Sequence, residues 1–222
     1  MPKTRAQVNS GWAECELALY ASFPDLRDEL EALREPGAVR AVLVRGEAFA
    51  EAGAALTESD CRWLELFELP TLFTFDGELG GTALQVALSC DIRICGPAAS
   101  FRVPIGSRRS LLLIGVEASA DLLSVRGRVT ADAALAAGLV SNVAESSESA
   151  LAETRRLAGV IASRGPIAVR LAKEAFWRGL DQPLAQALRF ETDLTLLLQT
   201  TKDRAEGVRA FLEKRQPNFT GE

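Results

Sequence analysis

The sequence predicts an α/β protein that ends in an all-helical region. Strand-like and helix-like segments alternate through the first 145 residues, which is typical of α/β folds. A glycine turn at residues 77–81 joins one such strand to a strongly apolar helix. From residue 146 onward only helical patterns follow one another. We therefore expect an α/β core at residues 1–145 and a helical region at residues 146–222.

The first elements follow an unassigned start. Residues 1–16 show neither period-two alternation nor helical spacing, so they predict no element. Ser22 and Pro24 form a helix start, and apolar residues spaced i, i+4 and i+7 extend the predicted helix over residues 22–33. Residues 38–45 are rich in valine and have strand length, so we expect a strand there.

The middle of the chain leads into the glycine turn. Small residues after residue 45 suit close backbone packing in a loop open to a ligand. Thr57 and Asp60 have the spacing of a helix cap, which predicts a short helix as far as Phe67. Residues 70–76 then predict a buried strand that enters the turn, and residues 83–88 predict a central apolar helix.

Short strands and further helices complete the chain. Two strands are expected at residues 92–95 and 99–103, a buried run at 111–114 and a helix at 117–123. Thr130 caps an alanine-rich helix that stops at Gly138. The C-terminal helices are expected at residues 150–163, 166–180, 183–199 and 202–215.

The glycine turn has two interpretations. The first amides of the following helix have no intrahelical partner and lie at the positive end of the helix dipole, which favours a ligand oxygen there. The turn can equally serve only to connect a strand to a core helix, because a single glycine-rich turn is a weak signal. Local pattern alone leaves both interpretations open.

Composition excludes several classes of function. The chain has no histidine, which rules out Ser-His-Asp and Cys-His catalysis and histidine zinc sites. Four cysteines without a CxxC pair indicate free thiols, so no metal site is expected. A net charge of −5 argues against nucleic acid as a partner. No run approaches the roughly 18 apolar residues that span a bilayer, and no secretory pattern follows Lys3 and Arg5, so we expect a cytoplasmic protein without a membrane partner.

Five segments carry a resemblance to a known family: ALYASFPDLRDELEAL, AVRAVLVRGEAFAEAGA, PTLFTFDGELGGTALQVALSCDIRI, VTADAALAAGLVSNV and AEGVRAFLEKRQPNF. In this order they resemble the crotonase superfamily, the enoyl-CoA hydratases and isomerases, over roughly residues 18–219. The chain looks like a divergent, shortened member. The resemblance implies a crotonase-like spiral of ββα units with an all-helical C-terminal region, and a homotrimer or dimer of trimers packed through those last helices.

The resemblance also implies a ligand and a site. An acyl-CoA would be the substrate or ligand, with no separate cofactor. Its thioester oxygen would be held by the backbone amides of Ala54 and Thr82, which follow Gly53 and Gly81. Fixed amide donors stabilise a thioester enolate without reorganisation. Thr82 stands where glycine is common in the family, and its β-branched side chain would lie beside the acyl group.

Two positions depart from the family pattern. Typical hydratases carry a glutamate at each of the positions that match Gln85 and Ile105. Gln85 remains a candidate catalytic residue because glutamine can hydrogen-bond a water, but it does not accept a proton at neutral pH. Isoleucine has no polar group, so we expect two-glutamate hydration to be lost. Whether the chain is an enzyme stays open. The alternative is a non-catalytic acyl-CoA-binding or oligomeric interaction protein.

Other residues are candidates for the missing roles. Glu78, beside the glycine turn, is the first candidate for a replacement acid or base. Glu51, Glu117 and Asp121 stand behind it. For all four the sequence favours a solvated surface acid, because no spacing places any of them over the substrate. The loop after residue 103 carries the remaining candidates for substrate binding, namely Ile105 beside the acyl group and Arg108 and Arg109 beside the coenzyme A phosphates.

Overall fold

A six-stranded sheet, almost entirely parallel, forms the centre of the protein. The structure is a computed structural model, and it describes residues 5–34, 39–51, 54–102 and 128–222. The strands lie in the order β1-β2-β3-β4-β6-β9, and only β1 runs antiparallel to its neighbour. Their bounds are β1 Gln7–Val8, β2 Gly11–Glu16, β3 Val39–Arg45, β4 Thr71–Phe75, β6 Ile92–Cys95 and β9 Asn142–Val143.

A second, three-stranded sheet stands beside the glycine turn. It contains β5 (Glu78–Leu79), β7 (Ser100–Phe101) and β8 (Val129–Thr130), in that order. Each of these strands is two residues long, too short for the alternation by which a strand is recognised in a sequence. Only the region of β7 was therefore expected as a strand.

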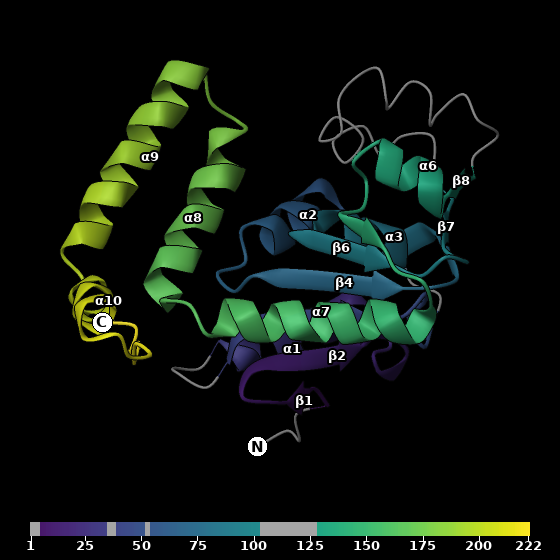
Figure 1. The fold of residues 1–222 in the computed structure, drawn as a ribbon. Coiled ribbons are helices and arrows are strands. Elements are labelled where there is room, and N and C mark those ends of the chain that lie inside the picture. The colour runs from purple at the N-terminus through teal and green to yellow at the C-terminus, as the bar shows by residue number, and fades with distance from the viewer. Residues whose placement is uncertain (1–4, 35–38, 52–53, 103–127) are drawn as a thin grey trace.

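Helices cover both faces of the large sheet (Figure 1). On one face lie α1 (Phe23–Leu33), α2 (Glu58–Glu65) and α3 (Gly81–Ser89), whose apolar side chains share one core with Val42, Val44 and Phe73. On the other face lies α7 (Ser147–Ala162), which packs on Ala41 and Leu72. Consecutive residues of β3 thus point to opposite faces, as in any strand with two covered sides.

The unassigned N-terminal residues form β1 and β2. Alternation is missing from β2 because Ala13, Glu14 and Cys15 are all buried in succession. A buried glutamate is tolerated here because Glu14 accepts hydrogen bonds from Arg45 at 2.7 Å and Arg155 at 2.8 Å. Burial raises the pKa of Glu14, but the two arginines outweigh this effect and the pKa lies below its ordinary value.

Most of the expected elements are confirmed. α1 begins after Ser22, β3 and β4 occupy the two predicted strands, and α2 begins with a capping box of Thr57 and Asp60. Thr130 caps α6 (Ala131–Ala136), and Gly138 beyond that helix has the positive φ of +76° that favours glycine. The run expected at 111–114 and the helix expected at 117–123 lie outside the described residues.

The C-terminal region contains α8 (Pro166–Gly179), α9 (Leu184–Gln199) and α10 (Lys202–Glu213). Figure 1 shows α8 and α9 side by side at the edge of the body, with α10 near their base. Asp91 ties α8 to the body, because its carboxylate binds Lys173 Nζ at 2.7 Å and Trp177 Nε1 at 2.7 Å. Across the ranges described, no helix is both long and apolar enough to cross a membrane.

Candidate functional site

The glycine turn places the N-terminus of α3 at the end of β4. Gly80 is the N-cap, and the first helical hydrogen bond runs from the Leu84 amide to the Gly80 carbonyl at 3.2 Å. Gly81 has a φ of +52°, and a Cβ built there would meet nothing within 4 Å. Backbone conformation rather than crowding therefore demands glycine at this position. The amide of Thr82 precedes the first helical bond and has no intrahelical acceptor.

The opposite end of α3 is fixed by a half-buried arginine. Arg93 donates to the carbonyls of Ala87 at 3.1 Å and Cys90 at 2.5 Å, and also to Leu139 at 2.7 Å. Burial lowers the pKa of Arg93, yet the cation is matched by the carbonyls at the negative end of the helix dipole. With most of its side chains buried as well, α3 is a rigid support for its first turn.

The loop after β3 meets the first turn of α3. The hydroxyl of Thr82 donates to the carbonyl of Ala54 at 3.1 Å. Ala54 is exposed and Thr82 is half-buried. The structure therefore brings together, at the surface, the two residues whose amides are expected to hold an anion. Gly53, expected beside them, lies outside the described residues.

Gln85 lies one turn further along α3 and contacts the same loop. Its side-chain oxygen accepts a hydrogen bond from the Leu56 amide at 2.8 Å, and its side-chain nitrogen donates to the Leu56 carbonyl at 3.3 Å. The side chain is half-buried, and Leu56 is buried. The amide of Gln85 is thus engaged with the protein backbone. No feature of the sequence pointed to this contact, because Leu56 takes part only through its main chain.

Glu78, the first candidate for a replacement acid or base, is paired with two arginines. One carboxylate oxygen binds Arg102 at 2.5 Å and the other lies 3.6 Å from Arg128. Its side chain is 38% exposed, and both arginines are more exposed still. Arg128 also donates to Ser100 at 3.1 Å. The sequence did not predict these two partners, because only the small three-stranded sheet brings the arginines beside Glu78.

The other candidates are placed less informatively. Glu51 is exposed on the loop after β3. The remaining candidates lie outside the described residues: Ile105, Arg108, Arg109, Glu117 and Asp121. Within the part of the chain that is described, no group of three or more potential ligands is placed to hold a metal ion.

The three buried cysteines are poorly suited to act as nucleophiles. All four thiols are free, as the sequence indicated, and Cys15, Cys90 and Cys95 are buried. Burial raises the pKa of Cys15 and of Cys90 to about 12, and that of Cys95 to about 11. These thiols therefore stay protonated at neutral pH, whereas nucleophilic attack requires the thiolate.

An open cavity of about 440 Å³ lies at the carboxyl ends of β2, β3 and β4. Its lining includes Glu16, Arg45, Glu47 and Asp76. Arg45 pairs with Glu16, and Glu47 accepts a hydrogen bond from the Asp76 amide at 3.2 Å. Ligands of open α/β sheets bind at such strand ends, but these carboxylates would repel phosphate groups. The cavity therefore does not suit the phosphates of a nucleotide.

Comparisons with known proteins identify relatives of the whole chain. The family model described as enoyl-CoA hydratase/isomerase matches residues 58–222. The 2,3-dehydroadipyl-CoA hydratase of Escherichia coli (strain K12) is 32% identical, with 90% of this chain and 89% of that protein aligned. The crotonyl-CoA hydratase of Syntrophomonas wolfei is 34% identical, with 74% of this chain and 67% of that protein aligned. This chain spans 56% of the length of a mitochondrial relative from Arabidopsis thaliana.

Solved structures of enoyl-CoA hydratases share the fold of this chain. The crystal structure of the enoyl-CoA hydratase from Bacillus anthracis superimposes with a TM-score of 0.84 at 28% identity, covering 98% of this chain and 99% of that one. The match extends over the body and the C-terminal helices alike, so the expected crotonase-like fold is confirmed. By sequence and by fold, the chain belongs to the enoyl-CoA hydratase/isomerase family of the crotonase superfamily.

Proposed function

We propose that the protein binds acyl-CoA thioesters and holds the thioester oxygen between the backbone amides of Ala54 and Thr82. The observation that carries this proposal is the 3.1 Å hydrogen bond from the Thr82 hydroxyl to the Ala54 carbonyl. It joins two chain segments 28 residues apart at the exposed N-terminus of a helix whose other end is fixed. Amide donors that are already in place favour an oxygen that becomes negative.

Family membership supports the ligand class. The relatives from E. coli and S. wolfei are both named as hydratases of CoA thioesters. Coenzyme A thioester would be substrate or ligand, with no separate cofactor. Arg108 and Arg109 are proposed to meet its phosphates, and Gly53, Gly81 and Ile105 to line the acyl group.

We further propose that two-glutamate hydration is lost. Gln85 cannot take a proton from water at neutral pH, and its amide is engaged with Leu56. Ile105, at the second position, offers no proton acceptor. Since one positioned acid or base contributes about 10²–10⁴ in rate, loss of both makes hydration slow even with the anion site intact.

Residual chemistry would be of the enolate-stabilising kind, such as migration of a double bond. Of Gln85 and Glu78, only Glu78 can carry a proton. Arg102 and Arg128 occupy both of its oxygens, so a proton transfer would require one ion pair to open. Both pairs are exposed, and exposed pairs are worth only about 1 kcal/mol or less.

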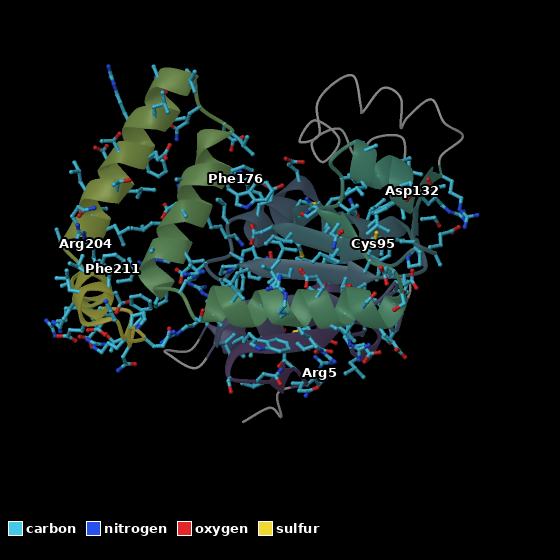
Figure 2. The ribbon with its side chains drawn as sticks, viewed as in Figure 1. Arg5, Cys95, Asp132, Phe176, Arg204 and Phe211 are labelled. Carbon is cyan, nitrogen blue, oxygen red and sulfur yellow. The ribbon has the colours of Figure 1, made fainter. Side chains whose placement is uncertain are left out.

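A homo-oligomer, a trimer or dimer of trimers, is proposed to form through the C-terminal helices. Large apolar side chains stand exposed on α9 and α10, with Leu184 at 74%, Phe211 at 82% and Leu212 at 74%. Figure 2 places Phe211 on α10, away from the strands of the body. An apolar groove of about 400 Å³ lies between α8 and α10. Such exposed surface is typical of a contact between chains.

Ligand titration tests the function. The probe is a carba analogue of an acyl-CoA, in which a methylene replaces the sulfur and the carbonyl remains. We expect saturable binding to the purified protein, together with crotonyl-CoA hydration far below the rate of the E. coli relative on its own substrate. Absence of saturable binding would refute acyl-CoA recognition and leave an oligomeric interaction protein, which the exposed C-terminal leucines favour. Hydration at a comparable rate would refute the loss of that reaction.

A further inference from the structure

Two side chains of α3 supply three hydrogen bonds to the loop after β3. Thr82 donates to the carbonyl of Ala54 at 3.1 Å, and Gln85 bonds both the amide and the carbonyl of Leu56 at 2.8 and 3.3 Å. Residues three apart on a helix face the same side, so both side chains reach the same short stretch of backbone. We name the contacts of Thr82 and Gln85 with residues 54–56 the loop clamp.

Among the described residues, this stretch of the loop makes few main-chain hydrogen bonds. Just before this stretch, the Ala50 amide donates to the Tyr20 carbonyl at 2.9 Å. The next fixed point is the capping box of Thr57 and Asp60 at the start of α2. Buried polar groups of the backbone need partners, and the clamp supplies them at Leu56.

An amide at position 85 suits this role better than a carboxylate. The Gln85 side chain offers one acceptor and one donor to the same residue, as a neighbouring strand would. An ionised glutamate accepts only, so it would bond the Leu56 amide and face the Leu56 carbonyl with like charge. Glutamine is therefore suited to hold the backbone, whereas glutamate is suited to move protons.

We infer that Gln85, together with Thr82, is a positioning residue that locks the backbone of residues 54–56 against α3 and does not itself act on the substrate. Through the loop clamp, the Ala54 amide is held opposite the Thr82 amide before a ligand arrives. Donors held in place need no reorganisation when the anion forms. The ligand side of this inference rests on the proposed acyl-CoA function, while the lock itself can be measured without ligand.

The test compares matched variants. Gln85→Met keeps the length of the side chain without its amide, and Thr82→Val keeps the shape without the hydroxyl. Thr82→Ser restores the hydroxyl and serves as the rescue. Gln7→Met changes an exposed glutamine on β1, the strand at one edge of the sheet, and serves as the control. Hydrogen exchange of residues 54–57 is measured by mass spectrometry on each ligand-free protein.

Affinity is then measured for two ligands. One is the carba analogue, which keeps the carbonyl oxygen, and the other is a thioether analogue of the same chain length, which lacks it. Because the amides act on the carbonyl oxygen, a loosened lock should weaken only the first ligand. A merely structural role would weaken both ligands alike.

We expect exchange of residues 54–57 to rise about tenfold in Gln85→Met and in Thr82→Val, as for loss of one or two hydrogen bonds. Affinity for the carba analogue should fall about tenfold, with the thioether unchanged and with Thr82→Ser and Gln7→Met like the parent. Unchanged exchange would overturn the lock, and equal weakening of both ligands would overturn positioning. If the parent protein binds neither analogue, the proposed function fails, and the exchange result alone decides whether the lock exists.

Discussion

The side-chain amide of Gln85 pairs with the backbone of Leu56, accepting from its amide at 2.8 Å and donating to its carbonyl at 3.3 Å. By resemblance to the family, this is a position at which typical hydratases carry a catalytic glutamate. The side chain at this position of α3 therefore holds the neighbouring loop, one turn beyond the amide that is proposed to bind an anion.

Restoring both carboxylates should restore hydration. The variant Gln85→Glu with Ile105→Glu is expected to hydrate crotonyl-CoA at least about 10² times faster than the parent, because each positioned acid or base contributes about 10²–10⁴. The glutamate forfeits the bond to the Leu56 carbonyl, but one hydrogen bond is worth about 1 kcal/mol, which is less than the expected gain. Hydration is followed by the loss of enoyl-thioester absorbance.

The single variants are the controls for this prediction. Each carries one carboxylate only and should remain within about tenfold of the parent, because groups that act as a unit are not additive and one carboxylate contributes little without the other. A double variant as slow as the parent would show that more than these two positions separates the chain from a working hydratase.

Residual turnover, where it is measured, is expected to depend on Glu78. Glu78→Gln should remove it and leave the affinity for the carba analogue within about twofold, because the side chain is proposed to carry a proton rather than to bind. The matched variant Arg102→Gln removes an ion-pair partner and keeps the carboxylate, so it should retain turnover. If the Glu78→Gln variant kept the turnover rate of the parent, Glu78 would have no role beyond its ion pairs at the surface.

The exposed C-terminal apolar residues predict a dissociable assembly. Phe211→Glu should convert the oligomer to monomers, because a charge would have to be buried in the proposed contact. Leu135→Glu on α6 makes a similar change at an apolar side chain that is 41% exposed on the body, and should leave the mass unchanged. Analytical ultracentrifugation reports the mass. A parent protein that sediments as a monomer would contradict the proposal outright.

The buried Glu14 predicts a pH dependence of stability. Its pKa is lowered in the folded state, so its contribution is fully present above the ordinary value of 4.5 and is lost as pH falls through the lower folded value. Glu14→Gln should cost about 2 kcal/mol of unfolding free energy at pH 7, reduced from a fully buried pair because both arginines are partly exposed. Urea unfolding should show this difference shrinking below pH 4.

Glu16→Gln is the control for that experiment. Glu16 also pairs with Arg45, but its side chain is 36% exposed, and exposed pairs contribute about 1 kcal/mol or less. An equal cost for the two substitutions would show that burial of Glu14 adds nothing to its ion pairs.

Long elements were predictable from the sequence because their signals are local. Cap residues and apolar spacing in the sequence predicted α1 and α2, and the glycines predicted the turn before α3. β2 was not predictable, because the buried Glu14 is paired with Arg45 and Arg155, which lie 31 and 141 residues away in the chain. The two-residue strands β5, β7 and β8 form by pairing with segments far away in the chain, so their own residues carry no local strand pattern.

The candidate site was also only partly predictable from the sequence. The glycine and helix pattern left open whether the N-terminus of α3 holds an anion, and only the resemblance named the amides of Ala54 and Thr82 as its donors. The contacts of Gln85 and Glu78 could not be foreseen, because one involves the main chain of Leu56 and the other an arginine brought near by a small sheet. Such contacts depend on backbone placement and leave no pattern in the sequence.

The most direct test of the anion site is the carbonyl stretching frequency of a bound thioester labelled with ¹³C at the carbonyl carbon, measured by difference infrared spectroscopy. If the amides of Ala54 and Thr82 hold the oxygen as proposed, they polarise the carbonyl more strongly than water does, so the frequency of the bound ligand should lie below that of the free ligand. A bound thioester whose carbonyl absorbs at or above its frequency in water would contradict the account.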